Sequence, residues 1–200
     1  YPGPYDPARF PYFARILDVL RPDHPAREVA LMKSAQIGGT VLAMVFMGGT
    51  MDLDPGQALY VHPTDGNATR WYRTKWRPFL RNTAVLRTLF GVERSRDATN
   101  TATYQERRDG RGSLVVAGAN SPAQLSMLSA SRQVQDDLAK WQPNEAGDPE
   151  SQADSRSKAF PWAKIFKIST PLHWHSCRIT RAYRAGTQEQ WHVPCPHCGT

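Results

Sequence analysis

The 200-residue sequence has few cysteines, no long apolar run and no leader-like beginning, and each shortage argues against a class of protein. Three cysteines, two of them in one Cys-x-x-Cys pair, do not make a disulfide framework and favour a reducing, cytoplasmic setting. The longest apolar stretch, residues 41–47, is far short of the roughly 20 residues that a membrane span needs. The first residues are rich in proline and lack the charged-then-apolar pattern of a signal peptide. We therefore expect no membrane association.

The composition bounds the size and the charge of the protein. With 40% hydrophobic residues, the chain has enough apolar surface for one well-buried domain and little for a second. The net charge of +7 favours a polyanionic partner such as nucleic acid, although many basic proteins bind none. The chain begins without an initiator Met and stops two residues after Cys198, so we expect it to be part of a longer protein.

A glycine-containing stretch follows a buried-strand pattern at 28–32 and precedes an apolar helix pattern at 41–47. Strand, tight turn, hydroxyl residue and helix is the layout of a phosphate-binding loop, in which backbone N–H groups face an anion. The usual Gly-Lys before the hydroxyl residue is missing, and Lys33 is the only lysine able to fold back over the phosphates. The alternative is an ordinary turn with Lys33 solvated. The predicted phosphate-binding residues are Lys33, Ser34, Ala35, Gln36, Ile37, Gly38, Gly39 and Thr40, with Thr40 also a magnesium ligand.

A second pattern places acidic residues at the end of a predicted strand, residues 132–137. In an ATPase, a first carboxylate such as Asp136 holds magnesium, and a second such as Asp137 polarises the attacking water. The strand is poorly apolar, and a surface acidic pair is the simpler interpretation of these residues alone. The next predicted strand, 164–168, leads into Ser169 and Thr170, where a polar side chain is placed to sense the γ-phosphate.

The other patterns give a coarse outline of the chain. Residues 12–20 predict a helix, and Tyr12 is a candidate for stacking on adenine, with packing of the arm as the alternative. Residues 67–80 predict a helix with interleaved aromatic and basic residues, which suits either a nucleic-acid backbone or an apolar stripe with a solvated basic face. Further predictions are strands at 57–62, 101–105, 113–118 and 190–193, helices at 83–90, 121–128 and 178–184, a turn at 52–56, and a loop at 142–157 with a helical turn near 153–158.

Taken in order, these motifs resemble the ATPase part of the large subunit of lambda-type phage terminases. The resemblance covers nearly the whole chain and is carried by six stretches: 28–40, 59–64, 112–122, 136–137, 168–171 and 193–199. It implies a RecA-like P-loop (ASCE-type) α/β domain with a mostly parallel sheet flanked by helices. It also implies an ATPase that drives double-stranded DNA into a procapsid through the portal, in the host cell cytoplasm.

The resemblance also implies roles for individual residues. Lys33 corresponds to the lysine at the head of a deviant Walker A loop, Asp136 and Asp137 to the family's Asp-Glu pair, and Ser169 and Thr170 to its coupling motif. Tyr12 corresponds to an adenine contact, and ATP and Mg²⁺ are the implied ligands. Asp137 is shorter than glutamate by about 1.5 Å, roughly one C–C bond. Since about 1 Å of misplacement can cost on the order of 10²-fold, turnover is expected to be slow.

The implied organisation has three parts: an N-terminal arm at 1–25, the P-loop ATPase domain at 26–188, and a linker segment at 189–200 that leads toward a nuclease domain outside this chain. No nuclease activity is therefore expected here, and the segment that recruits the small terminase subunit lies upstream. The motor class implies a homo-oligomeric ring with an arginine supplied in trans. Arg132 and Arg156 are candidates, although a salt bridge is the simpler role for either.

The Cys195–Cys198 pair is half of a structural zinc site. His192 or His197 is a candidate third ligand, and His173, His175 and Cys177 would share a face if they lay on a strand. We expect the missing zinc ligands to lie beyond Thr200.

Two other functions stay open at this stage. One is a helicase-like DNA translocase ATPase, which requires a second RecA-like lobe. The other is a catalytically weakened DNA-binding or assembly module that keeps the P-loop fold, and the missing Gly-Lys leaves room for it.

Overall fold

The computed structural model describes residues 6–90, 100–174 and 176–199. In these residues six strands form one sheet in the order β1-β6-β5-β2-β4-β3. All neighbouring strands are parallel except the β3–β4 pair, so the predicted mostly parallel sheet is confirmed. Residues 1–5 of the predicted arm, His175 and Thr200 lie outside the described residues. The strands are β1 (Glu28–Met32), β2 (Gln57–His62), β3 (Tyr104–Glu106), β4 (Ser113–Gly118), β5 (Arg132–Asp136) and β6 (Lys164–Ser169).

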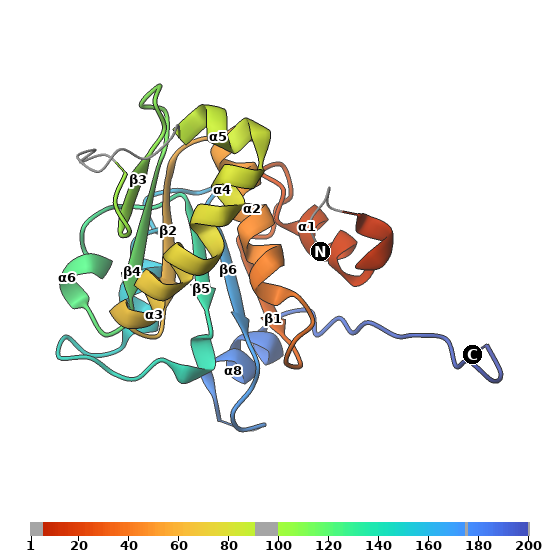
Figure 1. The fold of residues 1–200 in the computed structure, drawn as a ribbon. Coiled ribbons are helices and arrows are strands. Elements are labelled where there is room, and N and C mark those ends of the chain that lie inside the picture. Colours follow the sequence, from red (N-terminus) through yellow and green to blue (C-terminus); the bar gives the residue numbers. More distant parts are fainter. Residues whose placement is uncertain (1–5, 91–99, 175, 200) are drawn as a thin grey trace.

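Helices cover both faces of the sheet (Figure 1). Successive side chains of each strand point to opposite faces, so each face contributes to its own apolar cluster and is buried by the helices that pack on it. The first cluster packs α1 (Tyr12–Val19), α2 (Gly39–Leu53), α3 (Asp65–Trp71), α4 (Arg77–Asn82) and α5 (Ala84–Phe90) against one face. The second packs α6 (Pro122–Leu125), η3 (Leu138–Lys140), α7 (Pro149–Ser155) and α8 (Arg178–Ala185) against the other. The short turn η1 (Pro7–Arg9) precedes α1, and η2 (Tyr72–Trp76) joins α3 to α4.

β5 is buried along its whole length although its sequence is polar. Gln133 donates to the carbonyl oxygen of Ala153 at 2.7 Å and to Ser157 Oγ at 2.6 Å, and Gln135 donates to Asp154 at 2.7 Å. These partners lie on or just after α7, so the helix supplies the hydrogen bonds that a buried amide needs. The prediction of a surface acidic pair is therefore wrong for Asp136, which is 6% exposed at the end of this strand.

The predicted helix at 67–80 is one continuous helical segment, α3–η2–α4, with a π-helical turn in its middle. Trp71, Tyr72 and Trp76 are buried against the sheet, whereas Arg73 and Lys75 are exposed. Of the two interpretations, the apolar stripe with a solvated basic face is therefore confirmed.

Several predicted boundaries need correction. α2 extends from Gly39 to Leu53, because its apolar residues continue well past Met47, so the predicted turn begins only at Asp54. α7 begins at Pro149, where Asp148 caps it by accepting from Ser151 N, so the predicted loop is shorter. No strand forms at 190–193 in the described C-terminal segment, which runs away from the sheet in Figure 1.

Candidate functional site

The carboxyl ends of four parallel strands bring the predicted site residues to one edge of the sheet, the lower edge in Figure 1. Lys33 directly follows β1, Asp136 ends β5, Ser169 ends β6 and His62 ends β2. β6 lies between β1 and β5, and Lys33 N donates to the carbonyl oxygen of Ser169 at 3.1 Å. Lys33 and Asp136 are therefore on the same edge, separated by one strand. Ligand sites of open parallel sheets form at this edge.

The loop between β1 and α2 is a tight turn. Gln36 and Gly38 have positive φ angles of 64° and 84°, and Gly38 is the N-cap of α2. A Cβ on Gly39 would lie 2.4 Å from Lys33 Cε and 2.7 Å from Ile168 Cδ1. With alanine at this position, the ends of the Lys33 and Ile168 side chains would therefore have to shift away from the first turn of α2. Thr40 follows in the same turn.

Lys33 lies back over the loop, and its Nζ donates to the carbonyl oxygen of Ser34 at 3.4 Å. Its charge acts to lower the pKa of Asp136, which places the ammonium within electrostatic reach of that carboxyl. This arrangement is what a lysine at the head of the loop requires if it is to reach phosphate oxygens.

Tyr12 lies against the loop from the outside. Its hydroxyl donates to the carbonyl oxygen of Ile37 at 3.1 Å, and its ring packs edge-on to Phe13 and Trp191. Phe13 is buried in the core beneath it. The aromatic pair thus attaches the N-terminal helix to the loop, as the packing alternative predicted. The half-buried Tyr12 ring also stays beside the loop, where adenine stacking would need it.

Asp136 is a buried carboxyl whose hydrogen-bond donors within the described residues are neutral. It accepts from the Tyr60 hydroxyl at 3.0 Å and from Asp137 N at 2.9 Å. Burial and, to a smaller extent, the Asp137 charge raise the pKa of Asp136 to about 6, and the Tyr60 hydrogen bond opposes the rise. A divalent cation bound to this carboxylate would offset the cost of burying its charge, so the site fits Mg²⁺.

Asp137 turns away from the strand. It has a positive φ of 52°, its side chain is 40% exposed, and its carboxylate pairs with Lys140 Nζ at 2.8 Å on the next turn. The two carboxyls therefore differ: Asp136 is fixed inside, while Asp137 is held at the surface by an exposed ion pair.

Ser169 and Thr170 connect the end of β6 to the turn after Asp137. Ser169 is buried, its hydroxyl donates to the carbonyl oxygen of Thr170 at 3.0 Å, and it accepts from Ala139 N at 3.1 Å. Ala139 lies in η3, which begins immediately after Asp137. The predicted coupling residues are thus linked by one hydrogen bond to the backbone that carries the second acidic residue.

The residue that sequence reasoning left without a role is His62. It is 5% exposed, and its Nε2 has no hydrogen-bond partner in the described residues. Its ring stacks on Tyr60 at 4.9 Å between centroids and lies 5.0 Å from the Trp71 ring. Burial lowers the pKa of His62 to about 4, and the Asp137 carboxylate opposes the shift. The available signal was a polar residue at the carboxyl end of an otherwise apolar parallel strand.

Arg132 does not fit a role in trans. It is 3% exposed at the start of β5, on the edge of the sheet opposite Asp136, and it forms an ion pair with Asp54. It also donates to the carbonyl oxygens of Ser131 and Trp162. The salt-bridge alternative is confirmed for this residue. Arg156 is half-buried and donates to Ser155 Oγ.

The predicted zinc ligands lie in different structural environments. Cys177 is a buried N-cap of α8, not part of a strand, whereas Cys198 and His197 are exposed on the C-terminal segment. Within the described ranges no group of three or more His, Cys, Asp or Glu side chains is placed to hold a metal ion.

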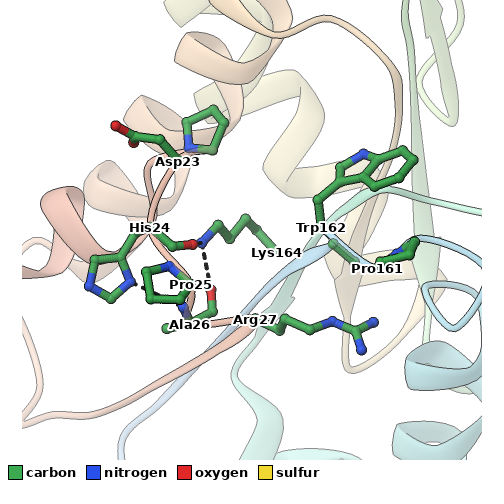
Figure 2. A pocket seen from close by; sticks show the side chains of 10 residues that line it. Asp23, His24, Pro25, Ala26, Arg27, Pro161, Trp162 and Lys164 are labelled. Atoms are coloured by element: carbon green, nitrogen blue, oxygen red, sulfur yellow. Dashed lines mark hydrogen bonds between the residues drawn. The ribbon is translucent and has the colours of Figure 1, made fainter.

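A cavity of about 310 Å³ lies at the opposite edge of the sheet, where β1 and β6 begin. Figure 2 shows the Lys164 ammonium pointing to the carbonyl oxygens of His24 and Ala26. Arg27 donates to the carbonyl oxygens of Ser157 and Phe160. Both cations are therefore occupied by backbone groups, and we assign this cavity no ligand.

Comparison with known proteins places this architecture in a class. The fold is similar to that of the large terminase ATPase domain of Thermus phage P74-26, with a TM-score of 0.51 and 17% identity over 86% of this chain and 70% of that chain. At this identity the likeness shows the fold alone. The class is thus an α/β domain built like a terminase ATPase domain.

The sequence comparisons identify the family. The model of the family "Phage terminase large subunit gpA, ATPase domain" matches residues 1–200, and the chain belongs to this family. It is 28% identical to the terminase large subunit of Escherichia phage lambda, over 94% of this chain and 30% of that protein. It is 26% identical to the terminase large subunit of Enterobacteria phage P21, over 98% of this chain and 31% of that protein. The chain therefore spans about 30% of the length of these curated relatives. None of its helices in residues 6–90, 100–174 and 176–199 has the length and apolar character of a membrane span.

Proposed function

We propose that this chain is the ATP-hydrolysing motor domain of a terminase large subunit that packages double-stranded DNA into a procapsid. The observation that supports it most directly is the convergence of Lys33 and the Asp136–Asp137 pair on one edge of the sheet, within a chain that belongs to this family. An ammonium and two carboxyls around a loop with positive φ angles suit a nucleoside triphosphate and its metal.

The residues divide the chemistry among them. Lys33 and the N–H groups of residues 34–40 bind phosphate oxygens, and the half-buried ring of Tyr12 contacts adenine beside the loop. Thr40 and Asp136 hold Mg²⁺, which supplies charge neutralisation at the phosphates. Asp137 orients the attacking water and accepts its proton, as the oxygen–phosphorus bond to water forms and the bond to the leaving ADP oxygen breaks.

Ser169 and Thr170 pass the phosphate state to the rest of the motor. This role is supported by the 3.1 Å hydrogen bond from Ala139 N to Ser169 Oγ, because it joins β6 to the turn that holds Asp137. A change in that turn on hydrolysis would therefore be felt at the end of β6.

The wider assembly is also proposed from the family. The motor acts as a homo-oligomeric ring on double-stranded DNA in the host cell cytoplasm, docked on the portal of the procapsid, and the small terminase subunit binds through segments outside this chain. Arg156 is the remaining candidate for an arginine in trans. Residues 1–25 form an arm, 26–188 the ATPase domain, and 189–200 the start of a linker toward a nuclease. Cys195 and Cys198 bind Zn²⁺ only together with ligands from outside this segment.

ATP turnover of the full-length protein that carries this chain tests the proposal. Lys33→Ala and Asp137→Ala should both lose most of the turnover, with Asp137→Ala retaining nucleotide binding because it acts after binding. Unchanged turnover in both variants would refute the assigned roles, and nucleotide binding without any hydrolysis in the wild type would favour an assembly module instead.

A further inference from the structure

The strongest unexplained feature of the site is the buried imidazole of His62. Its Nε2 is enclosed, and in the described residues nothing accepts from it or donates to it. Buried polar atoms nearly always have a partner, so this nitrogen at the edge of the candidate site requires one that the described residues do not supply. Because the low pKa keeps the ring neutral, its two nitrogens are one donor and one acceptor.

The position of His62 in the sheet places it beside the end of the strand that carries the acidic pair. β2 and β5 are parallel neighbours with Tyr60 opposite Val134, so His62 falls beside the end of β5. Tyr60 and Asp136 are on the same face of the sheet, joined by a 3.0 Å hydrogen bond, and His62 shares that face because it is two residues from Tyr60. The Tyr60 ring, with which His62 stacks, therefore links the imidazole to the Asp136 carboxyl, and the Asp137 charge is close enough to oppose the fall in the pKa of His62.

The partner of Asp137 in this structure is a weak one. Lys140 and Asp137 form an exposed pair three residues apart, with side-chain exposures of 51% and 40%. Such pairs contribute little to stability, so the carboxylate leaves Lys140 at low cost. The negative charge of Asp136 opposes an inward position of Asp137, because like charges repel and the Asp137 charge raises the pKa of Asp136. Neutralisation of Asp136 removes that opposition.

We propose that His62 is a positioning residue that receives the Asp137 carboxylate, with Nε2–H donating to it once Asp137 has left Lys140. In that inward position the carboxylate faces the site and orients the attacking water, and in the outward position seen here it does not. The inference rests on the proposed function for its catalytic meaning, but the contact between His62 and Asp137 is testable without turnover.

The first test reads the contact directly in the absence of nucleotide and metal. In full-length protein labelled with ¹⁵N-histidine, Lys140→Ala releases Asp137, and in an Asp136→Asn background, which removes the opposing charge, it should shift the His62 Nε2 resonance, which His62→Phe assigns by its disappearance. The same shift should appear in the wild type on addition of Mg²⁺ and a non-hydrolysable ATP analogue, and Asp137→Asn should reduce it. An unchanged His62 resonance under both conditions would overturn the proposal.

The second test separates positioning from packing. His62→Phe keeps the stacked ring and removes the unpaired nitrogen, so its Tm should equal or exceed that of the wild type while kcat falls about 10- to 100-fold at a nearly constant KM. His62→Gln restores a donor and should recover part of kcat. In an Asp137→Ala background, His62→Phe should cause no further loss, because it acts through that carboxylate.

Trp76→Phe is the matched control. Trp76 belongs to the same aromatic row, 5.5 Å from the Trp71 ring, and its Nε1 is also buried without a partner in the described residues. It should leave kcat unchanged. Wild-type kcat in His62→Phe, or losses that add in the double variant, would overturn the inference. By contrast, a wild type without ATP turnover contradicts the proposed function and leaves the resonance test decisive.

Discussion

The two edges of the parallel sheet differ in whether their buried polar groups have partners. At the edge where the strands begin, Arg132 and Lys164 are buried cations whose donors reach backbone carbonyls, and Arg132 also pairs with Asp54. At the edge where they end, Asp136 has a raised pKa and His62 has an unpaired nitrogen. Since an unpaired buried group costs free energy, we expect a ligand that supplies the missing partners to stabilise the second edge.

The difference shows how one sheet divides stability and function. At the first edge the buried cations Arg132 and Lys164 already have partners in the folded chain. Substitutions there should therefore change the free energy of unfolding and leave ATP turnover unchanged. The second edge carries positive φ angles at Gln36, Gly38 and Asp137 together with incomplete polar groups, so its residues should affect chemistry more than unfolding. Substitutions at each edge test this division.

Lys33→Ala should have the largest effect. It removes the only cation that lies over the loop in the described residues, and loss of such a charge typically costs about 10²- to 10³-fold in turnover. The free energy of unfolding should hardly change, because Lys33 makes one weak hydrogen bond to Ser34. Steady-state ATPase assays and urea unfolding measure the two quantities. The exposed Lys158→Ala is the control, and a Lys33→Ala protein with full turnover would contradict the division.

Gly39→Ala should have the next largest effect on turnover, roughly 10- to 100-fold, comparable to an ångström-scale displacement of a reacting group. Its Cβ would lie 2.4 Å from Lys33 Cε, so the lysine stem must leave the first turn of α2. Nucleotide binding and turnover should fall together.

Gly49→Ala on the same helix is the matched control, because a Cβ there meets nothing within 4 Å. It should leave turnover unchanged and stabilise the protein by about 0.5–1 kcal/mol. Equal turnover in Gly39→Ala and Gly49→Ala would show that Lys33 does not need to lie across Gly39 for activity.

Arg132→Met tests the completed edge and should lower the free energy of unfolding by about 2 kcal/mol. It removes a donor from the carbonyl oxygen of Trp162, whereas the carbonyl oxygen of Ser131 still accepts from Lys164 N at 3.0 Å and the partly exposed Asp54 regains water. Turnover of the folded protein should stay at the wild-type level. Urea unfolding measures the loss, the exposed Arg73→Met is the control, and a selective loss of turnover in Arg132→Met would return it to the catalytic candidates.

Much of the fold was predictable because the strands β1 and β2 are short apolar runs between turn residues. β5 was harder, since Gln133 and Gln135 read as surface residues until α7 supplies their partners about 20 residues away. The π-helical turn at Tyr72–Trp76 leaves no mark in the apolar pattern, because its aromatic residues still face the sheet.

The site was predicted where a local pattern carries the chemistry and missed where tertiary contact does. The loop after β1 and the acids after β5 follow from strand-then-polar patterns, and the parallel sheet brings them to one edge. His62 follows the same pattern at the end of β2, but its significance depends on the rings of Tyr60 and Trp71 that enclose it. No sequence spacing reveals which buried nitrogen lacks a partner.

The smallest predicted effect is a pair of opposing pH dependences at the incomplete edge. Asp136 has a folded pKa of about 6 against an ordinary value of 3.8, so it favours the folded state below pH 4 and this contribution is lost as the pH rises through 6. His62 has a folded pKa of about 4 against 6.5, so its contribution is present above pH 6.5 and is lost as the pH falls through 4. In the wild type the two largely cancel.

Single substitutions should therefore expose opposite slopes between about pH 4.5 and 6.5, each of the order of 1–2 kcal/mol. Asp136→Asn leaves His62 alone, so the free energy of unfolding should fall on acidification relative to wild type. His62→Phe leaves Asp136 alone, so it should rise over the same range, and the double variant should again follow the wild type. Urea unfolding at both pH values without nucleotide or divalent cation measures this. Parallel pH profiles in the two single variants would contradict the raised pKa of Asp136 and the lowered pKa of His62, and with them the difference between the two edges.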